Sequence, residues 1–70
     1  MTLAHKVRFK RPFKDSGDSL VAWCMANVGT RYDTWDREIA HMDYDTASYA
    51  WVYAFHTAES AVAFAITHVN

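Results

Sequence analysis

Histidines and acidic residues are the side chains of this 70-residue chain that could bind a metal ion. No pair among His5, His41, His56 and His68 has the spacing of a zinc motif, and one cysteine cannot complete such a site. His41, Asp43 and Asp45 could hold a cation in a turn, but these residue types are equally ordinary in a solvated turn. We therefore expect neither a metal nor a cofactor.

Carboxylates could also serve as general acids and bases. Asp33, Asp36 and Glu38 lie close together in the sequence, but strand alternation would place Asp36 and Glu38 on a wet face. Acid–base catalysis needs a pocket that shifts a pKa, and so short a chain rarely encloses one. The sequence also shows no nucleophile elbow and no glycine-rich phosphate loop. We expect a protein that is not an enzyme, although a site between subunits remains open.

Cys24 is the only cysteine, so no internal disulfide can form. It falls within an apolar helical pattern, which predicts a buried and inert thiol rather than a nucleophile. The first residues lack the apolar run of a signal peptide, and no segment has transmembrane length. These features predict a cytoplasmic protein that does not bind membranes.

The charge is divided unevenly along the chain. Five basic residues and no acid give residues 1–14 a charge of +5, and the remaining residues carry −6. The formal net charge of −1 hides this division. A basic end on an acidic molecule bears on the choice of partner more than the total does.

The segment from residue 48 to 66 supplies much of the core and so positions the polar and charged side chains described above. Four aromatic residues alternate with small ones, which predicts a strand with its rings on one face: Tyr49, Trp51, Tyr53 and Phe55. Thr57 then begins an alanine-rich helix. A hydrophobic fraction of 51% and an aromatic fraction of 16% make a core feasible at this length.

Three further elements precede that unit. Residues 5–13 alternate as a half-buried strand that ends near Pro12. A helix follows the turn at residues 15–19, with Ser16 or Asp18 as its cap and Gly29 as its end. Its apolar stripe comprises Leu20, Val21, Cys24, Met25 and Val28. Residues 31–41 read as a second strand, and residues 41–46 as a polar hairpin connection.

The order β-α-β-β-α predicts an α+β two-layer sandwich that occupies residues 1–70 as a single compact domain. The third strand would lie between the first two in an antiparallel or mixed sheet, and both helices would cover one face. The product is a ferredoxin-like fold that lacks its last strand.

Alternation decides which side chains meet the helices. If Val7, Phe9, Trp35, Ile39 and the rings of residues 49–55 face the helices, the other face is flat, small-centred and charged. Such a surface suits another sheet, a helix or a second copy of the chain. We predict a partner-binding surface on this face and the hairpin, made by Lys6, Arg8, Lys10, Glu38, Tyr44, Ala50, Val52 and Ala54.

Surplus aromatic residues also suggest protein binding. Trp23, Tyr32, Trp35 and Tyr44 are more rings than so small a core needs, and an exposed one would anchor a partner. Tyr44, between two acids in the hairpin, is the ring we expect to be exposed. Trp23 and Trp35 are expected to fill the core.

Nucleic-acid binding is the alternative function. The basic first strand could contact phosphates, and RNA-recognition sheets have a related topology. However, those sheets expose aromatic residues, whereas the rings here are in phase with the core, and the glycine–aromatic recognition motif is absent. A basic edge strand that prevents sheet-to-sheet aggregation explains the same residues equally well.

The ending WVYAFHTAESAVAF, residues 51–64, resembles a strand–turn–helix ending of small bacteriophage-encoded α/β proteins of unassigned function. The resemblance implies a protein that binds and blocks or redirects a host protein in the host cytoplasm, or a minor virion part, and it assigns no site residue. We therefore expect a non-catalytic protein–protein interaction module, a self-associating homodimer that regulates or inhibits a host protein.

Overall fold

The computed structural model describes residues 2–69 and contains three strands and two helices in the expected order. The elements are β1 (His5–Pro12), α1 (Asp18–Asn27), β2 (Trp35–Asp43), β3 (Ser48–Phe55) and α2 (Ala58–His68). The predicted β-α-β-β-α order is confirmed.

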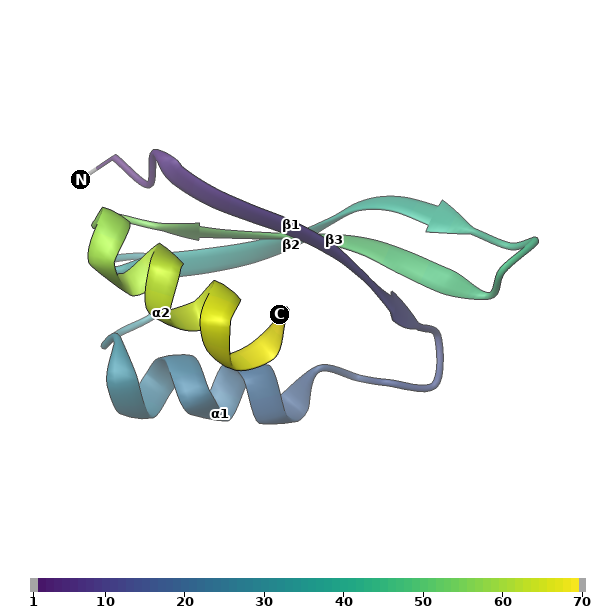
Figure 1. Ribbon diagram of the computed structural model, residues 1–70, viewed down its shortest axis with the longest axis horizontal. Helices are drawn as coiled ribbons and strands as arrows, with labels where there is room; N and C mark the ends of the chain where they lie inside the picture. The colour runs from purple at the N-terminus through teal and green to yellow at the C-terminus, as the bar shows by residue number, and fades with distance from the viewer. Residues whose placement is uncertain (1, 70) are drawn as a thin grey trace.

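The three strands form one open sheet in the order β1-β3-β2. Both outer strands pair antiparallel with β3, so they run in the same direction on either side of it. Figure 1 shows α1 and α2 on the same side of the sheet. The α+β fold with a central third strand and one uncovered face is as the sequence predicted.

The core lies between the sheet and the two helices. Side chains from the sheet and from both helices have no more than 2% exposure there: Leu20, Cys24, Trp35, Tyr53, Phe55 and Phe64. The ring of Phe64 stacks on that of Tyr53, with centroids 4.7 Å apart. Because the rings of β3 point at the helices, the predicted inward orientation of residues 49–55 is confirmed; Tyr53 and Phe55 are completely buried.

Local chemistry fixes three helix ends. Thr57 caps α2 as expected, because its hydroxyl accepts a hydrogen bond from the Ser60 amide at 3.2 Å. Gly29 follows the end of α1 with a φ of 138°, a conformation that favours glycine. The expected Ser16 or Asp18 cap of α1 is wrong. Gly17 occupies that position, with φ 76°, and no side chain caps the helix there.

The second strand begins and ends later than predicted. Residues 31–34 form a turn rather than a strand, in which Tyr32 has a φ of 74° and Thr34 donates hydrogen bonds to the Thr30 carbonyl. At the other end, β2 continues to Asp43, so His41 belongs to the strand and not to the connection. The turn lies at residues 44–47.

The hairpin contains a bulge, and two residues that were expected to be buried are exposed. Between Ile39 and His41 the register shifts by one residue, which leaves Ala40 without a partner on β3. The β2–β3 hairpin also extends past both helices (Figure 1). Ile39, expected in the core, is 44% exposed. Met25, expected in the apolar stripe of α1, is also exposed.

Candidate interaction surface

The face of the sheet opposite the helices is organised in three rows across the strands. Strand pairing places Lys6, Ala54 and Asp36 in the first row, and Arg8, Val52 and Glu38 in the second. Lys10, Ala50 and His41 form the third row. We call these nine residues the open face. Each row has a basic residue on β1 and a small residue in the centre.

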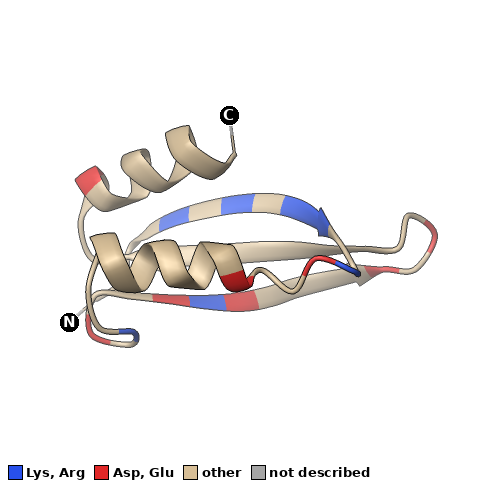
Figure 2. Ribbon diagram, turned by 90° about the horizontal axis from the view of Figure 1, so that it is seen from below, with Lys and Arg blue, Asp and Glu red and all other residues tan. Residues whose placement is uncertain are grey.

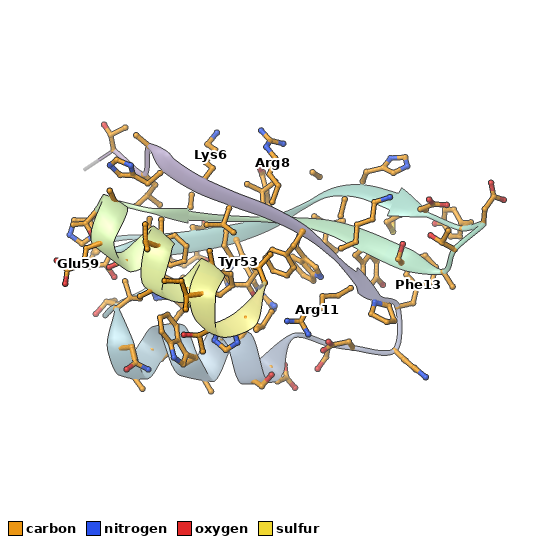
Figure 3. The ribbon with its side chains drawn as sticks, in the orientation of Figure 1. Lys6, Arg8, Arg11, Phe13, Tyr53 and Glu59 are labelled. Carbon is orange, nitrogen blue, oxygen red and sulfur yellow. The ribbon has the colours of Figure 1, made fainter. Side chains whose placement is uncertain are left out.

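The two edges of the open face carry opposite charges. Figure 2 shows basic positions along β1 and acidic positions along β2. Lys6 and Arg8 point away from the helices in Figure 3, whereas Tyr53 lies on the helix side of the sheet. Between residues 2 and 69, ion pairs join only Arg11 to Asp15 and Arg31 to Asp36. The charged ends of Lys6, Arg8, Lys10 and Glu38 therefore have no ionic partner within that part of the chain.

Val52 lies at the centre of the open face and separates two hollows. One, of about 190 Å³, lies beside Ala54, Lys6 and Glu38, and the other, of about 260 Å³, lies beside Ala50 and Arg8. The hollows exist because alanine side chains leave room between the longer side chains of the outer strands. Val52 pairs with Arg8 and Glu38 on the open face, as predicted, but it is only 4% exposed because its neighbours cover it.

Arg37 lies on the helix side of β2. Its guanidinium lies 4.7 Å from the centre of the Trp51 ring and donates a hydrogen bond to the Tyr53 hydroxyl at 3.3 Å. Burial raises the pKa of Tyr53, although this hydrogen bond opposes the effect. This cation thus stabilises the core side and contributes nothing to the open face.

Cys24 lies on the same side of the sheet, in the core. Burial raises the pKa of its thiol to about 12, and the nearby charge of Arg37 opposes this shift only in part. The thiolate is the nucleophilic form of cysteine, and it is scarce at neutral pH with such a pKa. The predicted burial of the Cys24 thiol is confirmed, and its raised pKa is in agreement with the predicted low reactivity.

Tyr44 lies on a different surface from the other predicted contact residues. It is 75% exposed at the hairpin, and its ring packs edge-on against Phe13, with centroids 5.6 Å apart. Phe13 in turn packs on Tyr49, whose side chain is on the helix side of β3. The expected exposure of Tyr44 is confirmed, but the surface predicted from the sequence separates into the open face and this hairpin cluster.

The carboxylate of Asp43, a candidate cation ligand in the sequence, forms hydrogen bonds within the turn beside Tyr44. Asp43 Oδ1 accepts hydrogen bonds from the amides of Asp45 and Thr46, at 3.0 and 3.3 Å. The bond from Thr46 is the largest of the effects that lower the pKa of Asp43. Among residues 2–69, no three His, Cys, Asp or Glu side chains are grouped so that they could hold a metal ion.

The open face thus contains seven of the eight predicted contact residues, all except Tyr44. Two further residues belong to it. Asp36 was expected to face outward, in phase with Glu38, but was left out of the contact set. His41 was missed because the bulge that turns it onto this face has no signal in the local alternation.

Comparison of the chain with protein families, with curated proteins and with solved structures gives no match. Neither of the helices described in residues 2–69 has the length and apolar character needed to cross a membrane.

Proposed function

We propose that this protein is a non-catalytic protein–protein interaction module that binds through the open face and self-associates. The observation that supports the proposal is a sheet with helices on one side only, whose other side has a small-residue centre between charges of both signs, of which Lys6, Arg8, Lys10 and Glu38 have no ionic partner among residues 2–69. Burial of the half-buried Ala50 and Ala54 against a second surface would supply the hydrophobic contribution, whereas Val52 is already covered within the single chain. The charged edges would set the orientation of the partner.

The proposed association is weak because the face is small. Eight residues of strand span about 26 Å and three strands about 14 Å, at the usual spacings of about 3.3 and 4.8 Å. Such a face covers about 370 Å² per copy, so two stacked faces bury about 730 Å² in total, which is below the roughly 1,200 Å² of stable specific interfaces and is typical of weak, transient contacts. The expected dissociation constant is therefore in the micromolar range or weaker, at about 10⁻⁶ M or above.

Sedimentation equilibrium over protein concentrations from about 10 μM to about 1 mM tests self-association directly. The expected result is a mass that rises with concentration for the natural chain. Val52→Lys, which puts a charge at the centre of the open face, should keep the protein monomeric. Ala50→Arg is a second variant that fills one of the hollows and should do the same.

Val62→Lys is the matched control for Val52→Lys. Val62 is 57% exposed on the outer side of α2, so the same change in size and charge occurs away from the open face. This variant should self-associate like the natural chain. A natural chain that stays monomeric throughout the concentration range would contradict the proposed self-association, and loss of association in Val62→Lys alone would move the interface to α2.

We further propose a host or regulatory protein as the physiological partner, following the resemblance of residues 51–64 to bacteriophage proteins. The same open face would bind it in competition with the second copy. Affinity purification from the native cell with the natural chain and with Val52→Lys tests this proposal. A specific partner should be retained by the first and lost by the second.

Nucleic-acid binding stays the second candidate because Lys6, Arg8 and Lys10 are exposed along one strand. The rings that could stack on bases are on the helix side of β3, which weakens this alternative. Binding to an oligonucleotide should then decrease steeply with salt and be abolished by Lys6→Glu combined with Arg8→Glu. An absence of salt-sensitive binding would remove this candidate.

A further inference from the structure

We propose that two copies meet through their open faces around a two-fold axis that runs along β3, so that Arg8 of each copy faces Glu38 of the other. This inference rests on the proposed self-association and specifies its geometry. It follows from the strand register of the open face, from the positions of its charges, and from the requirement that a symmetric dimer be closed.

Closure restricts the register of two stacked sheets. A two-fold rotation contains no translation along its axis, so residues that face each other across an axis parallel to the strands lie at the same height. The three rows of the open face are therefore stacked on the same three rows of the second copy. An axis centred on β3 places β1 of one copy over β2 of the other and gives the most complete overlap of three strands.

The charges in the first two rows are complementary under this rotation. In the second row, Arg8 lies over Glu38 of the second copy, and the two Val52 positions lie at the axis, each covered by its neighbours. In the first row, Lys6 lies over Asp36, which also pairs with Arg31 of its own chain. In the third row, Lys10 lies over His41, which is counted as neutral in the formal charge at pH 7. Each opposite-charge contact occurs twice because the dimer is symmetric.

The other two-fold axis that stacks the faces runs across the strands and gives the opposite result. It would place β1 on β1, with Arg8 over Arg8 and Lys6 over Lys10, and Glu38 over Glu38. Like charges in these positions repel, and this repulsion suppresses the wrong arrangement. The distribution of charge therefore selects the axis along β3.

A second copy suits these charges better than a pairing within one sheet. β1 and β2 are separated by β3, so Arg8 and Glu38 of one chain lie about two strand spacings, or about 10 Å, apart. Stacked sheets are also about 10 Å apart, but their side chains project toward each other and close that gap. This explains why the charged ends of Arg8 and Glu38 lack ionic partners in the described part of the chain.

The proposed contact also tolerates the usual twist of stacked sheets. Aligned sheets are rotated by about 30° relative to each other. Arg8 and Glu38 lie one strand spacing, about 5 Å, from the axis, so this rotation displaces them by about 2.5 Å. Side chains as long as arginine and glutamate span such a displacement. The contact between Arg8 and Glu38 in the second row is therefore the one on which the test of the arrangement is based.

Charge reversal and mixing test the arrangement. Arg8→Glu alone and Glu38→Arg alone each replace two attractive contacts with two repulsive ones, and each should weaken the homodimer by about tenfold or more. Mixed in equal amounts, the two variants should form a heterodimer, because both of its second-row contacts again join opposite charges. The double variant Arg8→Glu with Glu38→Arg should dimerise like the natural chain.

Two measurements make every outcome decisive. Lys14→Glu and Glu59→Arg are matched controls that change the net charge equally at exposed positions outside the open face, and they should leave dimerisation unchanged. Protection of the Cys24 thiol from reagents verifies that each variant is folded. A natural dimer whose single variants are not rescued by mixing overturns the axis but leaves the proposed function standing. A natural chain without self-association overturns both.

Discussion

Phe64 is the side chain whose removal tests the architecture most directly. It is the buried residue of α2, and its ring is the centre of a cluster with the rings of Phe9, Tyr53 and Phe55, at 5.7, 4.7 and 5.3 Å between centroids. Phe64→Ala would remove α2's main anchor on the sheet and leave a cavity. Such substitutions cost about 3–5 kcal/mol.

This cost is large relative to the stability of so short a chain. At about 0.05–0.15 kcal/mol per residue, 70 residues have a free energy of unfolding of about 4–10 kcal/mol. Phe64→Ala should therefore be partly or largely unfolded at 25 °C. Phe64→Leu keeps most of the volume and should lose about 1–2 kcal/mol, part of it from aromatic contacts worth about 0.5–1.5 kcal/mol per pair.

Urea unfolding followed by tryptophan fluorescence measures both effects, since Trp35 and Trp51 are buried in the same core. Val62→Ala is the control on the exposed side of α2 and should change stability by less than about 0.5 kcal/mol. A loss below about 1 kcal/mol for Phe64→Ala, with Val62→Ala equally harmless, would refute the packing of α2 on the aromatic side of β3.

Three further predictions concern single groups. The buried Cys24 thiol, with its pKa raised to about 12, should react with a thiol reagent only as fast as the protein unfolds, and stoichiometric labelling in native buffer would contradict its position. Thr57→Ala removes the cap on the Ser60 amide and should lower the free energy of unfolding by about 1 kcal/mol, whereas Thr57→Ser should retain most of it in the same urea assay. Burial and the nearby charge of Arg11 lower the pKa of His68 below 6.5, so the unfolded chain binds a proton first as the pH falls. The contribution of neutral His68 to the free energy of unfolding is therefore complete above pH 6.5 and declines as the pH falls below it. The urea midpoint of the natural chain should decrease between pH 8 and pH 5.5, and the decrease should be smaller in His68→Gln.

Much of the fold is predictable from local patterns because these patterns are themselves physical constraints. The alternation of residues 49–55 determines which side of β3 is apolar, and the hydroxyl of Thr57 satisfies an amide at the start of α2 wherever that helix packs. The alternation on β1 likewise places Lys6, Arg8 and Lys10 on one face. The composition of the open face was therefore available before the structure, apart from the residues affected by the bulge.

Tertiary structure alone decided the features that depend on how far one element reaches over another. Ile39 has the right phase for the core, yet it is 44% exposed, because phase alone does not ensure that another element covers a side chain. The bulge brings His41 into line with Ala50 and Lys10, and Val52 becomes covered by residues distant in the sequence. Alternation specifies which side of a strand a residue occupies. Only the packed molecule specifies what lies opposite it, since that depends on register and element length.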